Sequence, residues 1–473
     1  MKSKISLALL VILLVWTGAV LLLGQANITG VIQNSDKPAI AVPDFRGAGD
    51  AQKVMNTFNT TLWNELDSSG ILKMVAKTVY PLQVPQQPAD FKPPTVTTPV
   101  TRNAQPQTIS NGPWLTDWSG PPVNANDLAF GYAAAQDGRL VLFGWLYNLS
   151  QPTPQAAQLI GKTYTGPLDN AGAVQVAREF AADILQQFGA QSLAGSKIFF
   201  VSDRTGNKEI WSMDYDGSNQ KQLTHYNSIS SMPAVSPDGK LFAFTTYPVS
   251  VRNGHKFEGN PQIVIMSTET GRKLTFYNPV SSNVETAEFS PDGQHLFFAS
   301  AFDGIAQICE SNLQGGDFQR ISHNQAIEVS PKINPKTGRE MLFISGRSGR
   351  EQLWLSNVDG SGAEMLTDGS QYVANPAWSP NAQFVAYAAT GGYEPGNYNI
   401  FIMDIAKRVP IQLTHGNGRN ENPTWGPDGV HIAFSIKRGS STQIYTMLAD
   451  GTHIQQLTTQ GNNIQPVWAK GIN

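Results

Sequence analysis

An aliphatic residue followed by a hydroxyl residue recurs six times in this chain, and this repeat limits the possible folds more than any other feature. Successive pairs are 44 to 51 residues apart in a chain of 473 residues. The pairs are Leu223-Thr224, Leu274-Thr275, Ile321-Ser322, Leu366-Thr367, Leu413-Thr414 and Leu457-Thr458. A period of about 45 residues without a helical pattern is typical of the blades of a β-propeller.

A tight turn built on proline recurs in the same register. The turns are Ser236-Pro237-Asp238-Gly239, Ser290-Pro291-Asp292-Gly293, Asn334-Pro335-Lys336-Thr337-Gly338, Ser379-Pro380-Asn381-Ala382 and Gly426-Pro427-Asp428-Gly429. Proline presets φ at the first corner of such a turn, and glycine accepts the positive φ at its exit. Short apolar runs flank the turns, so each repeat holds four short strands.

The two ends of the repeat array indicate how it closes. The first repeat begins at Ile198–Ser202 with no strand and proline turn before it, whereas the last strand, Ile464–Trp468, has no repeat after it. The strand missing at one end matches the surplus strand at the other. We therefore predict a six-bladed all-β propeller over residues 196–473, closed by pairing the C-terminal strand into the first blade, because closure removes exposed sheet edges.

Residues 37–190 alternate between helical and strand patterns, which predicts a small N-terminal α/β domain. Asp50 can cap one helix, and either Asp169 or Asn170 can start a second. The first helix would carry Val54, Phe58, Leu62 and Leu66 on one face, and strands are expected at 39–42, 71–75, 139–149 and 158–165. Residues 191–195 would form a linker to the propeller.

Residues 81–123 are rich in Pro, Gln and Thr. Such a composition buries little apolar surface and cannot offset the entropy of ordering the chain. We therefore expect a Pro-rich insertion without stable order inside the α/β domain.

Residues 1–26 have the pattern of a signal peptide. Two lysines precede an apolar run over 5–23, and Gly24-Gln25-Ala26 offers a cleavage site between small residues. Residues 27–36 would then be an extended N-terminal segment. The apolar run is close to the length that spans a bilayer, so an uncleaved membrane anchor stays open beside cleavage, which we favour. In both cases the rest of the chain would lie outside the inner membrane.

Composition excludes several classes of protein. Lys and Arg number 33 against 36 Asp and Glu, for a formal net charge of −3, whereas a general nucleic-acid binder needs a basic excess. The single cysteine, Cys309, excludes an internal disulfide framework and fits a small core residue. His225, His323 and His415 fall at strand ends in alternate blades, too far apart to share a metal. We expect neither metal nor cofactor.

Enzymatic and sugar-binding propellers are the alternatives. The string Gly346–Arg350 lacks the final glycine of a hydrolase nucleophile elbow. The strands that should line the channel offer four carboxylates, Glu285, Glu288, Glu328 and Glu421, whose separation the sequence does not define. Trp378, Trp425 and Trp468 occupy equivalent places in their blades, which favours packing over sugar binding. A secreted propeller hydrolase and a sugar-binding propeller stay open beside a non-enzymatic binding protein.

Motifs of the first domain give a more specific indication than the repeats. They are Ile28–Val31, Pro38–Pro43, Ser69–Ile71, Gly161–Gly166 and Ala177–Ala181. Together with the repeats they resemble the TolB family, the periplasmic propeller proteins of the Tol-Pal envelope system. The resemblance covers nearly all of the chain after the leader, although the insertion at 81–123 is longer than the family pattern leads us to expect.

This resemblance implies a function. It implies a periplasmic, non-enzymatic adaptor that binds the peptidoglycan-associated lipoprotein through the propeller and TolA through its extreme N-terminus. It also implies a role in outer-membrane integrity and in constriction during cell division. Other outer-membrane lipoproteins are further candidate partners. We expect a monomer that reaches the membrane only through its partners and binds no nucleic acid.

The direction of the strands narrows the binding surface. Strands alternate in direction, so the tight turns share one face, and the connections after each Leu-Thr pair share the other with the middle loops, including the long excursion 249–259. These connections vary between blades, and variable loops on a rigid scaffold are where recognition usually occurs. We predict that they bind the lipoprotein, through residues His225, Tyr226, Tyr277, Asn278, His323, Glu328, Tyr372, His415 and Arg419.

The N-terminal segment is the second candidate binding site. Apolar residues alternate with polar ones at Ile28, Val31 and Ile32. Such a segment can add as a strand to the edge of another protein's sheet. We predict that it binds TolA in this way.

Overall fold

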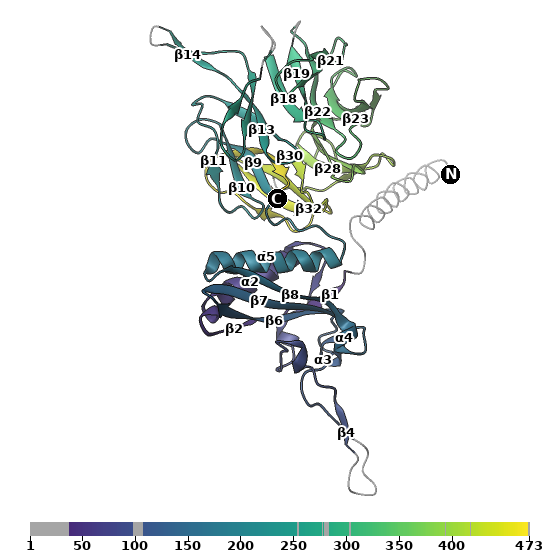
Figure 1. Cartoon of the computed structure of the whole chain (residues 1–473). Coiled ribbons are helices and arrows are strands. Elements are labelled where there is room, and N and C mark those ends of the chain that lie inside the picture. Colours follow the sequence, from purple (N-terminus) through teal and green to yellow (C-terminus); the bar gives the residue numbers. More distant parts are fainter. Residues whose placement is uncertain are drawn as a thin grey trace, which may run out of the picture. The chain divides into compact units, whose positions relative to one another are not determined.

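The computed structural model describes most of the chain (Figure 1). The described residues are 37–97, 107–252, 255–276, 278, 283–301, 304–392, 394–416 and 418–471. Residues 1–26 and 27–36, with the predicted signal peptide and the predicted TolA-binding residues Ile28, Val31 and Ile32, lie outside them. Over the described ranges, no helix has both the length and the apolar character needed to cross a membrane. The chain divides into two compact units, and the boundary between them along the sequence falls between Ala194 and Gly195.

The smaller unit is built on one mixed sheet. Its strand order is β3-β1-β6-β7-β8, with β2 paired to β6. β1 runs parallel to β3 and β6, and β2 also runs parallel to β6, whereas β7 is antiparallel to both β6 and β8. The strands are β1 (Ala39–Ala41), β2 (Arg46–Ala48), β3 (Lys73–Met74), β6 (Asp127–Gln136), β7 (Arg139–Asn148) and β8 (Gln158–Pro167).

Two helices cover one face of this sheet, α2 (Met55–Ser68) and α5 (Asn170–Gln187) (Figure 1). Phe58, Leu62 and Leu66 are buried in the core between them and the sheet, as the pattern predicted. The shorter helical elements are η1 (Gly49–Val54), η2 (Lys77–Val79), η3 (Pro88–Asp90), α3 (Thr116–Ser119) and α4 (Pro154–Ala157).

Of the two predicted helix caps, one is present in the structure and the other is not. The Asp169 side chain caps α5 by accepting a hydrogen bond of 2.8 Å from the Gly172 N–H. The prediction that Asp50 caps the first helix is wrong. A 3-10 turn begins earlier, after Ala48, and Asp50 instead forms an ion pair of 2.8 Å with Lys53 one turn on.

The insertion at 81–123 corrects another prediction, because its flanks are ordered. They pack a second core against the face of the sheet that the helices leave open. Its buried members from the insertion are Phe91, Leu115, Trp118 and Val123, and those from the sheet include Phe130 and Tyr147. The Phe91 and Phe130 rings lie 5.3 Å apart. A few large side chains therefore supply the burial that the average composition lacks. Between the flanks, β4 (Thr95–Thr97) and β5 (Gln107–Ile109) pair as a hairpin.

The larger unit is a six-bladed propeller, as predicted, since its described residues form six four-stranded antiparallel sheets. In order from the innermost strand outward, blade 1 holds β34 (Asn463–Ala469), β9 (Lys197–Ser202), β10 (Glu209–Asp214) and β11 (Lys221–Gln222), and blade 2 holds β12 (Ser230–Val235), β13 (Leu241–Thr246), β16 (Gln262–Ser267) and β17 (Lys273–Leu274). Blade 3 holds β18 (Asn283–Phe289), β19 (His295–Ala301), β20 (Ala306–Asn312) and β21 (Gln319–Arg320), and blade 4 holds β22 (Glu328–Ile333), β23 (Glu340–Ser345), β24 (Gln352–Asn357) and β25 (Glu364–Met365). Blade 5 holds β26 (Val373–Trp378), β27 (Phe384–Ala389), β28 (Asn399–Asp404) and β29 (Pro410–Gln412), and blade 6 holds β30 (Arg419–Trp425), β31 (His431–Arg438), β32 (Ser441–Leu448) and β33 (Gln455–Gln456).

The ring closes through blade 1. β34, the last strand of the chain, pairs antiparallel with β9, the first strand of the propeller, with Ile464 opposite Val201 and Trp468 opposite Ile198. The Trp468 indole N–H also donates to the Ser196 hydroxyl over 3.0 Å. The predicted closure is confirmed, so neither end of the array presents an unpaired innermost strand.

The proline turns are held by side chains as well as by backbone geometry. The Ser236 hydroxyl donates to the Asp238 carboxylate over 2.6 Å and accepts the Leu241 N–H over 2.9 Å. Donation from this hydroxyl and from the Lys240 N–H lowers the pKa of Asp238. The same contacts recur at Ser290 in blade 3. The repeated Ser-Pro-Asp-Gly string is thus explained by local turn chemistry.

Candidate interaction surface of the propeller

In most blades, the hydroxyl that ends the Leu-Thr pair fastens the end of its strand to the neighbouring strand, a contact we call the clasp. In blade 5 the Thr414 hydroxyl donates to Asn399 Oδ1 over 3.0 Å and accepts the Ile400 N–H over 2.9 Å. Five blades of the described chain carry a clasp, formed by Thr224–Glu209, Ser322–Gln307, Thr367–Gln352, Thr414–Asn399 and Thr458–Gln443. The clasp fixes the point where each connection leaves its blade.

Blade 2 replaces the clasp with an asparagine. Thr275 is exposed, and Asn278 three residues later takes over its role. The Asn278 side chain accepts the Ile263 N–H over 2.7 Å and donates to the Ile263 carbonyl over 3.0 Å. Asn278, a predicted lipoprotein contact, is therefore half-buried and engaged in holding its own loop.

The innermost strand of every blade contains a β-bulge in the same place. One residue of each bulge is left-handed, with φ between 52° and 56°: Met232, Thr286, Ser330, Asn375, Asn422 and Gln465. Five of these residues precede a proline, which a bulge tolerates because its N–H position is unpaired. Neighbouring bulges contact one another, since Gln465 Oε1 accepts the Met232 N–H over 2.8 Å.

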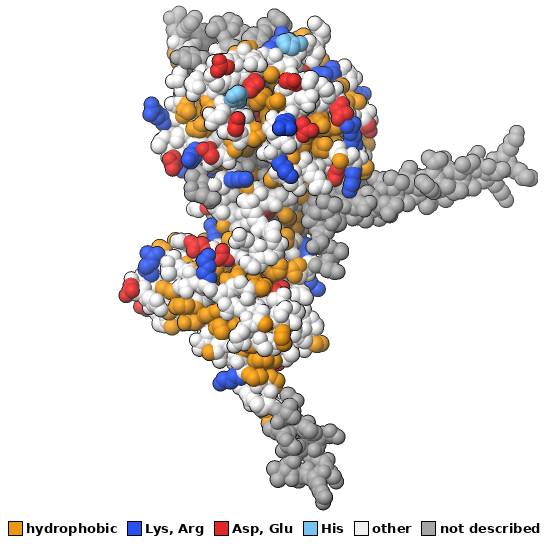
Figure 2. Space-filling model, turned by 45° about the vertical axis from the view of Figure 1, so that its right-hand side comes forward, with side chains coloured by type: hydrophobic (Ala, Val, Ile, Leu, Met, Phe, Trp, Pro, Cys, Tyr) orange, Lys and Arg blue, Asp and Glu red, His pale blue; other side chains and the backbone are white. Residues whose placement is uncertain are grey.

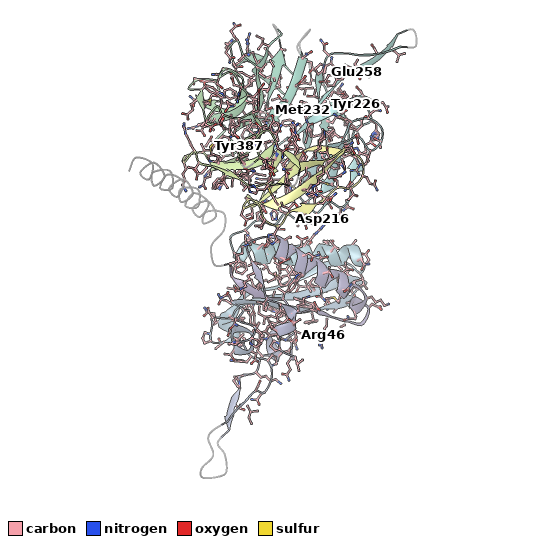
Figure 3. All side chains as sticks on the ribbon, turned by 180° about the vertical axis from the view of Figure 1, so that it is seen from behind. Arg46, Asp216, Tyr226, Met232, Glu258 and Tyr387 are labelled. Atoms are coloured by element: carbon pink, nitrogen blue, oxygen red, sulfur yellow. The ribbon has the colours of Figure 1, made fainter. Side chains whose placement is uncertain are left out.

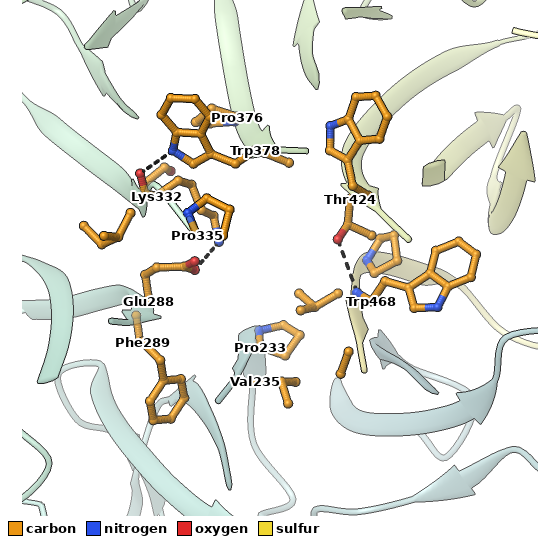
Figure 4. A pocket seen from close by; sticks show the side chains of 18 of the residues that line it. Pro233, Val235, Glu288, Phe289, Lys332, Pro335, Pro376, Trp378, Thr424 and Trp468 are labelled. Atoms are coloured by element: carbon orange, nitrogen blue, oxygen red, sulfur yellow. Dashed lines mark hydrogen bonds and ion pairs between the residues drawn. The ribbon is translucent and has the colours of Figure 1, made fainter. Parts of the chain in front are cut away.

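Between the bulges and the proline turns the inner strands enclose a cavity of about 420 Å³ (Figure 4). Lys332 and Glu288 form an ion pair of 2.5 Å on its wall, and the Trp378 indole N–H donates to the Lys332 carbonyl over 2.9 Å. Trp378, Trp425 and Trp468 are each at most 9% exposed, which fits the predicted packing role. Of the four carboxylates expected along the channel, Glu288 lines this cavity and is paired with a lysine.

The tight turns and the variable connections lie at opposite ends of the propeller. Figure 3 shows Tyr226 and Glu258 at one end and Asp216, in a tight turn, at the other. We call the end with the connections the loop face. The predicted contact residues that are exposed there are His225, Tyr226, His323, Tyr372, His415 and Arg419.

Several exposed side chains of the loop face are held in place by cation–π contacts. The Arg350 guanidinium lies 5.5 Å from the centre of the Tyr372 ring, and that of Arg419 lies 4.6 Å from the Tyr398 ring. Arg419 also forms an ion pair of 2.8 Å with Glu421. Such contacts orient the aromatic and guanidinium groups before any partner arrives.

The charge on this unit is mixed. Lys and Arg alternate with Asp and Glu over the propeller surface visible in Figure 2. Glu394, on the loop between β27 and β28, accepts hydrogen bonds from Asn399 and Asn397, and these lower the pKa of its carboxyl. Over the described ranges, no group of three or more His, Cys, Asp or Glu side chains is placed to hold a metal ion.

Two predicted contact residues need correction or fall outside the description. Glu328 is completely buried and forms an ion pair with Arg347, whose Nε lies 2.9 Å from Glu328 Oε1. It is therefore a structural residue, because a partner on the surface cannot reach it. Tyr277 lies outside the described residues. The predicted excursion at 249–259 forms the hairpin β14 (Val249–Arg252) and β15 (His255–Glu258).

Sequence reasoning missed Arg350, Tyr398 and Glu394 on the loop face. The first two lie next to predicted residues only through contacts between neighbouring loops, which leave no spacing signal in the sequence.

Cys309 lies where it was expected, fully buried in the core, and this burial raises the pKa of its thiol to about 12.

Comparison with known proteins adds the family. The sequence model of the TolB beta propeller domain matches residues 186–394 and 373–471. A protein named "Protein TolB homolog" from Chlorobium chlorochromatii is 32% identical over 220 residues, which are 46% of this chain and 46% of that protein. The "Tol-Pal system protein TolB" of Desulfosudis oleivorans is 31% identical over 153 residues, 32% of each chain. The matched part is thus about half or less of the length of these relatives.

A solved structure extends the likeness to the whole architecture. The crystal structure of TolB from Acinetobacter baumannii matches with a TM-score of 0.71 at 19% identity, over 92% of this chain and 97% of that one. At this identity the match shows a shared fold of α/β unit and propeller. The family match over residues 186–471, more than half of the chain, shows that this chain belongs to the TolB β-propeller family.

Proposed function

We propose that this chain is a periplasmic, non-enzymatic adaptor of the Tol-Pal envelope system. Its propeller binds the peptidoglycan-associated lipoprotein, and its N-terminal segment binds TolA. In this role it supports outer-membrane integrity and constriction during cell division. The observation that carries the proposal is family membership, together with a relative that is named as a Tol-Pal system protein.

The loop face supports binding to a protein rather than catalysis. Arginine and aromatic side chains dominate the energetically important contacts of protein interfaces, and this face presents Tyr372 and Arg419 in fixed orientations. The clasps fix the points where these connections leave their blades. Binding to such a surface requires little ordering of loops, and this lowers the entropic cost of association.

A pull-down with the lipoprotein tests the propeller site. Substituting His225, His323, Tyr372 and Arg419 together by Ala should lower retention of the lipoprotein at least about tenfold, because it removes exposed anchors of the face. The melting temperature should change little, since exposed side chains away from the core contribute little to stability.

A matched variant on the opposite face controls for general surface damage. Lys240, Glu269 and Arg339 are exposed beside the tight turns, and their joint substitution by Ala should leave retention unchanged. Full retention by the loop-face variant would contradict the assignment of the binding face.

The N-terminal segment is tested separately. Deleting residues 27–34 should remove binding to TolA while leaving binding to the lipoprotein intact, because the two sites lie on different parts of the chain. The measurement is retention of each purified partner by the deleted chain. Loss of both partners, or of neither, would contradict a TolA site in this segment.

A further inference from the structure

A pocket in the smaller unit holds a buried carboxylate to which no described residue is bonded. It has a volume of about 570 Å³ and is lined by Lys37, Pro38, Asn126, Asp127, Asn148, Leu159, Gln187 and Phe188. This volume falls within the range of roughly 300–1,000 Å³ that small-ligand pockets occupy. All eight lining residues belong to the smaller of the two compact units.

Asp127 is the unusual residue of this pocket. It is 4% exposed at the start of β6, between Ile40 of β1 and Asn148 of β7. No hydrogen bond or ion pair within the described ranges reaches its carboxylate. The amide oxygens of its neighbours point to other groups, because Asn126 Oδ1 accepts the Ala39 N–H over 2.8 Å and Asn148 Oδ1 accepts the Ser150 N–H over 2.9 Å.

We propose that this pocket binds the cationic side chain of an arginine or lysine from a partner protein, with the Asp127 carboxylate as the anion that holds it. This site goes beyond the adaptor function proposed above and does not depend on it. A buried carboxylate without a partner is costly, and a cation in the pocket would supply the missing counter-charge. Lys37 is the other charged residue of the lining, and it forms no ion pair with Asp127.

The rest of the lining fits a cation carried on an aliphatic stem. Pro38, Leu159 and Phe188 supply apolar wall, and Leu159 is 43% exposed. The stems of Arg and Lys pack on such surfaces while their charged ends reach a polar partner. Gln187 and Phe188 also mark the C-terminal end of α5, an 18-residue helix whose dipole places partial negative charge there.

Burial alone raises the pKa of Asp127 to about 6. The carboxylate is thus ionised at neutral pH and largely protonated at pH 5, whereas an arginine stays charged throughout. Binding of a cation should therefore weaken about tenfold between pH 7.5 and pH 5, in line with the fall in the ionised fraction.

Titration with two matched probes tests the proposal on the full chain. Nα-acetyl-arginine amide should bind saturably at pH 7.5 in ligand-observed NMR. Nα-acetyl-citrulline amide has nearly the same shape without the charge and should bind at least about tenfold more weakly, the difference expected for a charge-assisted hydrogen bond. Equal binding of both probes, or no saturable binding of the arginine amide, would overturn the proposal.

Substitution assigns the site. Asp127→Asn removes the charge at nearly constant volume and should abolish the preference for arginine over citrulline. Asp67→Asn makes the same charge change at an exposed position of the same unit and should preserve it. A preference that persists in the Asp127→Asn protein would overturn the assignment, whatever the outcome of the lipoprotein and TolA experiments.

Discussion

At the scale of single residues, the molecule buries polar groups for two different reasons. Glu328 is buried but paired with Arg347, so its charge is compensated within the blade. Asp127 is buried with no such compensation from the described residues. In a group of the first kind the partner offsets the cost of burying the charge, whereas a group of the second kind lowers stability and is typical of a binding site.

The pH dependence of unfolding should reveal the cost of Asp127. The folded-state pKa of about 6 lies above the usual value of 3.8, so the folded state binds the extra proton between these pH values. The contribution of this group to stability therefore rises as pH falls through the window, and at pH 7.5 its ionised form costs about 2 to 3 kcal/mol.

Asp127→Asn should accordingly raise the melting temperature at pH 7.5 and lose this advantage near pH 4. Thermal unfolding of the variant and of Asp67→Asn across this pH range measures the effect. A variant less stable than the parent at pH 7.5 would show that the carboxylate is compensated.

At the scale of strands and turns, the clasp explains why a hydroxyl residue recurs at the strand end in five blades of the described chain. One side chain satisfies a buried N–H and a buried side-chain oxygen at once, as Thr414 does with Ile400 and Asn399. Leaving such groups unpaired costs about 1–3 kcal/mol. The repeat is thus maintained by hydrogen bonding as well as by strand geometry.

Two isosteric substitutions test the clasp. Thr414→Val should lower the free energy of unfolding by about 1–3 kcal/mol, because it removes the hydroxyl that accepts the buried Ile400 N–H and that donates to Asn399 Oδ1. Thr275→Val removes the exposed threonine of blade 2 and should change the free energy of unfolding by less than about 0.5 kcal/mol. Urea unfolding measures both, and equal effects would mean that the clasp contributes nothing specific.

The same elements show what the sequence could and could not predict. Blade number and closure followed from the repeats, because turns and strand ends are set by neighbouring residues. The burial of Glu328 could not be predicted from the sequence, because it depends on the ion pair with Arg347. Pairing of β22 with β23 places Glu328 opposite Ser345, two residues before Arg347. The order of the Pro-rich flanks was missed because it comes from Phe91, Leu115 and Trp118 meeting a sheet distant in sequence.

The predicted loop-face site was recovered only in part for a related reason. The connections were identified because they differ between blades, but exposure within them depends on which side chains hold the loop itself. Asn278 and His323 both lie in the connection that follows an aliphatic–hydroxyl pair. The Asn278 side chain nevertheless fastens its loop to Ile263, whereas the His323 side chain is exposed. The cation–π partner of Tyr372 comes from another loop, at Arg350.

At the scale of the whole molecule, ring closure makes the last strand a structural necessity. β34 supplies the innermost strand of blade 1 and contributes Trp468 to the channel wall. Without it, β9 would present an unpaired edge, and the neighbouring blades would lose a packing surface.

Truncation should therefore be far more damaging than its length suggests. Ending the chain at Asn462 removes β34 and should lower the melting temperature of the propeller by about 10 °C or more, with aggregation through the exposed edge. Ending it at Gly471 removes two residues outside the described strands and should leave the melting temperature unchanged. Calorimetry with size-exclusion chromatography separates these outcomes, and a stable monomer ending at Asn462 would argue against closure.

Because the first and last strands of the propeller are neighbours in one sheet, its chain ends emerge side by side. Cutting the ring at another connection and joining Gly195 to Gly471 would preserve every strand pair. Circularly permuted propellers that begin at any of the other blades should therefore fold, and the order in which blades occur along the polypeptide should matter less than the unbroken cycle of their contacts. The closed ring therefore does not require the polypeptide to start at one particular blade.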